Sequence, residues 1–172
     1  KNILDIERNT LFLLADELNR FKKEKGLKDF NDLLEDFITK FDSDKPTNKF
    51  EVLFIDEAQD LSLLQWDMVR KIWSRAEKTY IAGDDDQAIF KWAGADVDHF
   101  IALKEEVDDI KILDQSYRIP GGPIHELSQK IIGKVQNRFE KTYKPRDEIG
   151  ILKRYSDITQ VDMSEGNWLV LS

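Results

Sequence analysis

Two adjacent carboxylates, Asp56 and Glu57, directly follow the short apolar segment Val52–Ile55. Four β-favouring apolar residues predict a buried strand of the kind found in parallel sheets. Open α/β sheets bind ligands beyond the carboxyl ends of their strands, which is where this pair lies. An aspartate there can hold Mg²⁺, directly or through water, and a glutamate can orient or deprotonate an attacking water. Acidic residues are also common at solvated strand ends, so the pair alone does not decide between the two interpretations.

A second segment that could do chemistry follows Thr79–Ala82, which predicts another buried strand. It contains three successive aspartates at 84–86, then Gln87, and then two aromatic residues, Phe90 and Trp92, on either side of a lysine. An amide in this loop can sense a charged ligand. Exposed rings beside a cation suit stacking on nucleic-acid bases, at about 1–3 kcal/mol per base. The alternative is that both rings anchor the core.

A third apolar run, Ile110–Leu113, predicts a short strand that delivers Tyr117 and Arg118. An arginine just past a strand end can grip a phosphate with its planar, bidentate guanidinium. Such an arginine can also stabilise charge during phosphoryl transfer. A structural ion pair with a carboxylate is the alternative role for Arg118.

The elements that would position these residues alternate between strands and helices, which predicts an α/β fold with a mainly parallel sheet. An amphipathic helix over 3–25 should end at Gly26, and a second should start at Asp29 and bury an apolar stripe. Ser62 and Gln65 form a plausible capping box for a third helix. This third helix should lie near 63–75, after a polar loop at 42–48. Two more helices are expected, one near 97–103 after Asp96 and one from Pro120 and Pro123 to about 137. A last strand is expected at 167–171.

The composition excludes some classes of protein and site. A formal charge of −8 argues against binding nucleic acid by bulk charge, although basic stretches at 22–28 and 141–154 leave room for a local groove. The chain has no cysteine, and therefore neither a disulfide nor a thiolate metal site. No apolar run approaches the roughly 20 residues that a membrane helix needs. We therefore expect an intracellular, cytoplasmic protein with no membrane partner.

The three segments together, in this order and spacing, resemble the UvrD/Rep-type superfamily 1 DNA helicases. Asp-Glu-Ala-Gln-Asp at 56–60 is similar to helicase motif II, the Walker B box, and 83–95 is similar to motif III. Gln-Ser-Tyr-Arg at 115–118 resembles motif IV, and 29–34 is similar to the segment that precedes motif II. The resemblance implies a bacterial or phage-like, ATP-dependent DNA helicase. Such an enzyme translocates on single-stranded DNA, usually 3′ to 5′, and unwinds duplex DNA.

The resemblance also implies roles for individual residues around the nucleotide. Asp56 would bind the Mg²⁺ of MgATP, and Glu57 would be the catalytic base for water. Gln59 and Gln87 would contact the nucleotide and couple its γ-phosphate to the DNA site. Tyr117 would stack on the adenine, and Arg118 would contact the γ-phosphate. Arg118 and Gln87 would both have catalytic roles. Phe90, Lys91 and Trp92 would bind single-stranded DNA.

Three positions of the motif III segment depart from the family pattern. Ala93 stands where many relatives carry an arginine that helps to hold DNA. Lys91 stands where many have glycine, and it can replace the missing charge. Phe90 stands where tyrosine is usual, which removes a hydroxyl and keeps the ring.

The fold that the resemblance implies is a partial RecA-like (P-loop NTPase) parallel sheet flanked by helices. Its expected parts are a helical segment of an inserted subdomain at 1–28, the C-terminal part of the first motor domain at 29–144, and a linker with the first strand of the second motor domain at 145–172. A phosphate-binding loop, G-x-x-x-x-G-K-[ST], is missing, because Gly133-Lys134 has neither the preceding glycine nor a following Ser or Thr. We therefore expect the central part of a helicase, whose partner motor domain belongs to the same parent chain and which turns over no ATP alone.

Two other functions stay open at this point. A degenerate relative would bind DNA or protein without hydrolysing ATP, although it would gain nothing from keeping both Asp56 and Glu57. A nuclease or phosphotransferase would use the aspartates at 84–86 as metal ligands. That site would need further carboxylates or histidines from elsewhere, and the sequence has no evident second cluster.

Overall fold

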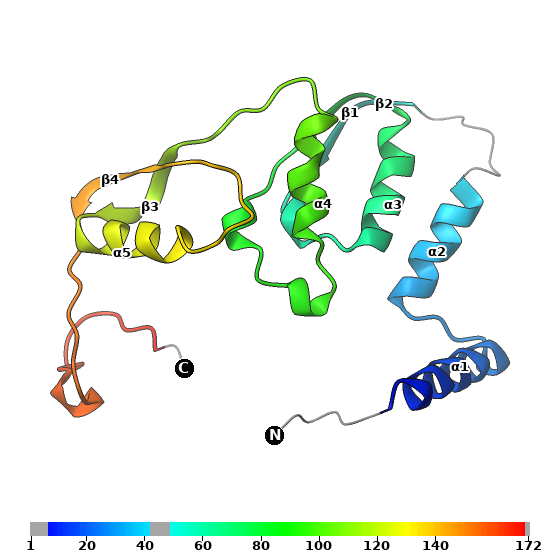
Figure 1. The fold of residues 1–172 in the computed structure, drawn as a ribbon, viewed down its shortest axis with the longest axis horizontal. Coiled ribbons are helices and arrows are strands. Elements are labelled where there is room, and N and C mark those ends of the chain that lie inside the picture. The colour runs from blue at the N-terminus through cyan, green and yellow to red at the C-terminus, as the bar shows by residue number, and fades with distance from the viewer. Residues whose placement is uncertain (1–6, 42–48, 171–172) are drawn as a thin grey trace. The chain divides into compact units, whose positions relative to one another are not determined.

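The computed structural model describes residues 7–41 and 49–170, which form two compact units, one ending at Leu103 and one beginning at Lys104 (Figure 1). Within the described ranges, no helix is long and apolar enough to cross a membrane. The first unit contains α1 (Arg8–Lys25), α2 (Phe30–Phe41), β1 (Phe50–Ile55), α3 (Leu63–Trp73), β2 (Ala76–Ile81) and α4 (Val97–Ala102). The second unit contains β3 (Gln115–Gly121), α5 (Pro123–Ile132) and β4 (Lys144–Ile149).

Strands β1 and β2 pair in parallel, with Phe50 opposite Ala76 and Ile55 opposite Ile81. Helix α3 connects them, and its buried side packs on the sheet, so the expected α/β class with parallel pairing is confirmed. The other side of the sheet carries Phe54 and Tyr80, which stack with 5.1 Å between ring centroids and stay largely exposed. The core of the unit consists of Ile55, Ala58, Trp66, Val69 and Leu103.

Local capping signals correctly located two helix starts. The Ser62 hydroxyl accepts a bond from the Gln65 N–H at 3.3 Å, and the Gln65 side chain accepts one from the Ser62 N–H at 2.8 Å. Asp96 accepts a bond from the N–H of His99 at 2.8 Å and so caps α4. Both contacts satisfy amide groups that the first turn of a helix leaves unpaired.

The strand expected at 110–113 is wrong, and so is the one expected at 167–171 within the described part of that range. Ile110, Ile112 and Leu113 have no regular structure and are 49%, 51% and 92% exposed. The strand begins two residues later, at Gln115, because β4 provides a parallel partner there. An apolar run forms a strand only where another strand satisfies its backbone groups. Helix α5 is shorter than expected, since it starts at Pro123 and ends at Ile132, before Gly133.

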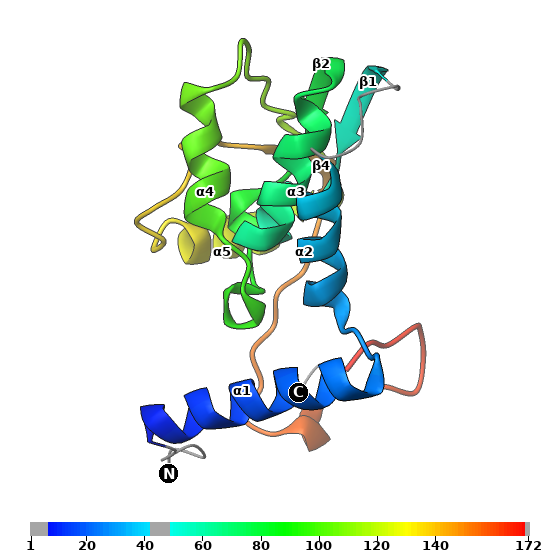
Figure 2. The same ribbon diagram turned by 90° about the vertical axis from the view of Figure 1, so that its right-hand side faces the viewer.

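Helices α1 and α2 bury less than their patterns predict. Gly26 ends α1 with a left-handed φ of 64°, as expected, but the apolar residues of α1 stay about half exposed. In α2, Leu34 and Ile38 are half-buried, whereas Phe30 is 86% exposed, so the expected buried stripe is only partly formed. Figure 2 shows α2 alongside α3, the helix that it contacts. The start of the first expected helix and the loop at 42–48 lie outside the described residues.

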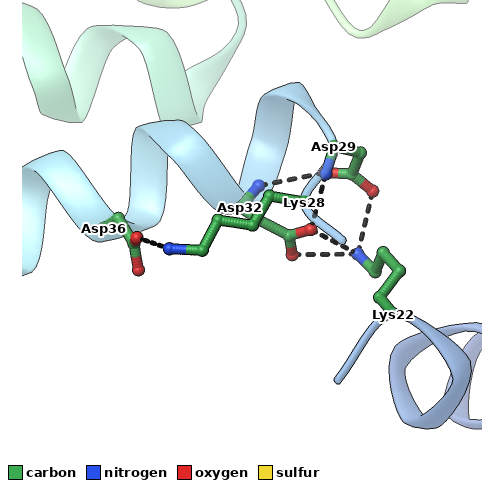
Figure 3. Close-up of polar contacts among 5 residues, drawn as sticks. All are labelled: Lys22, Lys28, Asp29, Asp32 and Asp36. Carbon is green, nitrogen blue, oxygen red and sulfur yellow. Dashed lines mark hydrogen bonds and ion pairs between the residues drawn. The ribbon is translucent and has the colours of Figure 1, made fainter. Parts of the chain in front are cut away.

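An ion-pair cluster fixes the junction between α1 and α2 (Figure 3). The Lys22 ammonium lies 2.9 Å from an Asp29 oxygen and 2.8 Å from an Asp32 oxygen, and its side chain is only 14% exposed. The two aspartates also cap each other, because each accepts the backbone N–H of the other. Lys28 pairs with Asp36 on the next turn of α2. The junction therefore combines helix capping with a charge bridge back to α1.

The ion pairs of Lys22 stabilise the junction between α1 and α2 over a limited range of pH. The hydrogen bond from Lys22, aided by the Asp32 N–H, lowers the pKa of the Asp29 carboxyl below its ordinary value of 3.8. Hydrogen bonds to Asp32 and then Asp29 raise the pKa of Lys22 above its ordinary 10.5. The stabilising contribution of Asp29 is fully present above pH 3.8 and is lost as the pH falls through its lowered pKa. The contribution of Lys22 is fully present below pH 10.5 and is lost as the pH rises through its raised pKa.

Replacing Lys22 should therefore change how Asp29 titrates. In Lys22→Met the pKa of the Asp29 carboxyl should rise toward 3.8, and only part of the shift should remain because the Asp32 N–H still donates. Carboxyl NMR titration of the two chains measures this directly. Lys23→Met removes the neighbouring charge on the same helix and serves as the matched control. An unchanged Asp29 titration in Lys22→Met would show that the bridge does not form in solution.

Candidate functional site

The carboxyl end of β1 presents two exposed carboxylates on a strained turn. Glu57 has φ 51° and ψ 39°, the one left-handed non-glycine residue within 7–41 and 49–170. The Asp56 Oδ1 atom accepts the Glu57 N–H at 2.9 Å, which stabilises this turn. Left-handed backbone in a residue with a side chain costs on the order of 1 kcal/mol or more and is concentrated at functional sites. Both acidic residues are thus exposed just beyond the end of β1.

A buried amide connects this turn to the end of the neighbouring strand. Gln59 is 1% exposed, and its Nε2 donates to Glu57 Oε2 at 2.7 Å. Its Oε1 accepts the backbone N–H of Asp84 at 2.9 Å. Because a backbone N–H can only donate, the oxygen of the amide must face Asp84, and the nitrogen must therefore face Glu57. This side chain joins the two loops beyond the backbone bonds that the Ala82 N–H donates to Ile55 and the Ala58 N–H donates to Ala82.

Gly83 makes room for that amide. A Cβ atom at this position would lie 2.8 Å from Gln59 Oε1 and 2.8 Å from Cζ of Phe100. Both distances are shorter than real Cβ contacts allow, and both neighbours are packed in the interior. The sequence pattern marked Gly83 only as the end of a strand, and the requirement for glycine becomes visible once Gln59 and Phe100 approach it.

The loop after β2 continues the hydrogen-bond chain to Gln87. The Gln87 Nε2 donates to Asp84 Oδ2 at 2.6 Å, and the Asp86 N–H donates to Asp84 Oδ1 at 3.2 Å. The expected site residues Glu57, Gln59 and Gln87 therefore lie on one path that passes through Asp84, which sequence reasoning gave no such part. No group of three or more histidine or acidic residues in the described ranges is arranged to hold a metal ion. The carboxylate of Asp84 is instead used to build the turn.

The aromatic segment that follows is exposed and firmly attached at its far end. The side chain of Trp92 is 84% exposed and that of Phe90 is 43% exposed, with 6.4 Å between their ring centroids. Lys91 lies between them, 3.7 Å from an Asp98 oxygen. Buried Ala95 then bridges to Ser62, beside the turn after β1. Trp92 is therefore not a core residue, and the alternative that both rings anchor the core is wrong for it.

Tyr117 and Arg118 belong to the second unit. Both lie inside β3, whereas the sequence pattern placed them just past a strand end. Tyr117 is 86% exposed, and Arg118 is exposed as well. The Ser116 hydroxyl accepts the N–H of Arg118 at 3.3 Å and that of Ile119 at 3.0 Å, which shapes the start of the strand. The structure thus brings together the expected site residues of the first unit, whereas Tyr117 and Arg118 belong to the second.

The geometry at the strand ends agrees with a comparison of the chain with known protein families. Residues 5–108 match the family described as UvrD/REP helicase N-terminal domain. The chain belongs to this family. The matched range includes every expected site residue of the first unit and excludes Tyr117 and Arg118.

Curated relatives agree with this assignment. The chain is 28% identical over 132 residues to the ATP-dependent DNA helicase Rep of Buchnera aphidicola, covering 72% of this chain and 19% of that protein. It is 32% identical over 144 residues to the ATP-dependent DNA helicase PcrA of Staphylococcus epidermidis, covering 80% and 20%. For PcrA of Bacillus subtilis the identity is 28% over 148 residues, covering 82% and 20%. The chain spans about a fifth of the length of these relatives.

Adding a methyl group at Gly83 should disturb the bridge between the strands. Gly83→Ala should destabilise the first unit by about 1–3 kcal/mol, because the new Cβ must displace the Gln59 amide or the Phe100 ring. Gly121→Ala is the matched control, since a Cβ there would meet its neighbours only at 3.6 Å. Urea unfolding of both variants measures the difference. Equal stability of Gly83→Ala and the unchanged chain would mean that the amide is not held as described.

Proposed function

We propose that this chain is part of an ATP-dependent DNA helicase that translocates on single-stranded DNA, 3′ to 5′, and unwinds duplex DNA. The observation that carries the proposal is the hydrogen-bond path from Glu57 through Gln59 and Asp84 to Gln87. This path connects the carboxylates of Asp56 and Glu57 to the loop that carries the exposed rings of Phe90 and Trp92. Family membership and the names of the relatives support it. The fold we propose is the RecA-like motor domain, with the divisions at 28/29 and 144/145 expected from the sequence.

Asp56 fits a role as the protein ligand of Mg²⁺ in MgATP. Mg²⁺ usually keeps several waters and is held by one or two carboxylates plus the substrate phosphates, so one exposed carboxylate at the strand end is sufficient. Its Oδ1 accepts the Glu57 N–H, which fixes the carboxylate beside the proposed base. When bound, the ion would neutralise charge that develops on the transferred phosphoryl group.

Glu57 would accept a proton from the attacking water. Its carboxylate is exposed at the strand end, and the bond from Gln59 to Oε2 holds one oxygen, which leaves Oε1 as the atom to meet the water. Gln87 and Arg118 would contact the γ-phosphate and stabilise its charge, and Tyr117 would stack on the adenine. These assignments rest on the resemblance to the family. Arg118 and Tyr117 are exposed, as a ligand contact requires.

The aromatic segment would bind the DNA. Trp92 and Phe90 would stack on bases of the single strand, and Lys91 would contact a phosphate. Because the segment begins three residues after Gln87, the nucleotide and DNA contacts would share one loop. The isolated 172-residue chain has no phosphate-binding loop motif, so we propose that turnover needs the full-length protein.

Glu57→Gln in the full-length protein tests the catalytic assignment. Turnover should fall by about 10²–10⁴-fold, because an amide cannot accept the proton of the attacking water. Binding of MgATP should persist, because the new amide oxygen can still accept the bond from Gln59. Steady-state ATPase rates and nucleotide titration measure the two effects. Turnover within about two-fold of the unchanged protein would contradict the role of Glu57 and favour a module that binds without hydrolysis.

Trp92→Ala and Lys91→Ala test the DNA assignment. Loss of the ring should weaken single-stranded DNA binding by about 1–3 kcal/mol, and the melting temperature should change little because the ring is 84% exposed. Loss of the lysine should instead reduce the salt dependence of binding by about one counterion. DNA titrations at two salt concentrations distinguish the two signatures. Normal DNA affinity of Trp92→Ala would end the stacking assignment.

A further inference from the structure

We infer that Gln59 is a positioning residue that acts on ATP hydrolysis through Glu57, and that it does not contact the nucleotide itself. The inference rests on the proposed function and deepens it. The family resemblance places Gln59 among the residues that touch the nucleotide. The geometry of its amide points to a different task, which is to hold the base in place and to connect it to the loop after β2.

The first argument is access. Gln59 is 1% exposed, whereas Asp56 and Glu57 on the same turn are exposed. Both ends of its amide are engaged within the protein, the nitrogen with Glu57 and the oxygen with Asp84. At 1% exposure the amide offers almost no surface to a phosphate, and Glu57 already occupies one of the two N–H donors of its nitrogen.

The second argument is direction. The backbone N–H of Asp84 requires an acceptor, so the amide cannot turn over without losing both bonds. Its N–H is therefore always presented to Glu57 Oε2. A base needs its accepting oxygen held in place against the water, and displacement by about 1 Å can cost on the order of 10²-fold in rate. Gln59 supplies that constraint from below the turn.

The third argument is connection. Asp84, which donates its N–H to Gln59, also accepts the side chain of Gln87. A movement of the 84–87 turn would therefore reach the carboxylate of Glu57 through a single buried side chain. Gly83 lets the amide approach that closely, because a Cβ there would collide with Gln59 Oε1.

Two variants of Gln59 separate its two bonds in the full-length protein. Gln59→Glu keeps an oxygen to accept the Asp84 N–H but replaces the donor to Glu57 with a second carboxylate, which repels it, whereas Gln59→Met removes both bonds. Both should lower kcat by on the order of 10–10²-fold and leave KM for ATP within about two-fold. Gln136→Met, an exposed glutamine outside the site, is the matched control for the chemical change and should behave as the unchanged protein.

The decisive measurement is a double-mutant cycle with Glu57→Gln. If Gln59 acts through Glu57, adding Gln59→Met to Glu57→Gln should lower kcat no further, because residues that act as a unit are not additive. Multiplicative losses of kcat, or a loss of MgATP affinity in Gln59→Met, would overturn the inference and restore a direct nucleotide contact. A Glu57→Gln protein with normal turnover would instead overturn the proposed function.

Amide hydrogen exchange gives a readout that does not depend on activity. The peptide that contains Asp84 should exchange faster in Gln59→Met, which lacks an acceptor, and should remain protected in Gln59→Glu. Equal protection in both variants would show that the bridge to Asp84 is absent and would overturn the inference. If Gln59→Met fails to fold, Gln59→Glu alone provides the kinetic test. A lower kcat with an unchanged KM for ATP in that variant would support the inference, and an unchanged kcat would overturn it.

Discussion

The buried side-chain amide of Gln59 connects the two loops that follow β1 and β2, in addition to the backbone bonds of Ala58 and Ala82 at the strand ends. Parallel pairing of β1 and β2 brings the two loops to the same edge, but the ladder itself ends at Ile55 and Ile81. Beyond that point, Gln59 ties Glu57 to Asp84. The absent side chain of Gly83 makes room for this amide, and the left-handed backbone of Glu57 and the Asp84–Gln87 bond lie at its two ends.

The same edge combines rigid and open parts in a definite order along the chain. The buried amide and the core beneath it are fixed by packing around Trp66. The carboxylates above them are exposed, and the aromatic loop projects further into solvent while its far end is bridged to Ser62. A site of this kind can meet two different ligands, one at the carboxylates and one at the rings, because a single short loop carries the contacts between them.

The sequence was informative where structure depends on local signals. The capping box at Ser62 and the glycine after α1 correctly located their elements, because neighbouring residues determine them. The apolar run of β1 did so as well, because β2 provides its partner. The start of β2 was missed because Glu77 and Lys78 are charged, and pairing with β1 overrides their polarity.

Long-range contacts explain what the sequence could not show. The apolar residues 110–113 form no strand because β4 pairs further along the chain. The burial of Gln59 depends on the approach of Gly83, more than twenty residues away, and the exposure of Trp92 depends on how its loop is anchored. A sequence motif such as Asp-Glu-Ala-Gln-Asp identifies candidate site residues but does not say which of them is exposed to a ligand and which is buried.

Because Trp66 is buried and Trp92 is exposed, their intrinsic fluorescence can report on two different parts of the first unit. Trp66 is fully buried in the core, and Trp92 projects from the aromatic loop into water. Indole emission shifts to longer wavelength with hydration, so the two rings emit in different parts of the spectrum. Once the two other tryptophans of the chain, Trp73 and Trp168, are replaced by phenylalanine, iodide quenches Trp92 first and leaves Trp66 to report unfolding. A single fluorescence sample can therefore report ligand binding near Trp92 and unfolding of the core around Trp66 separately, without an attached dye.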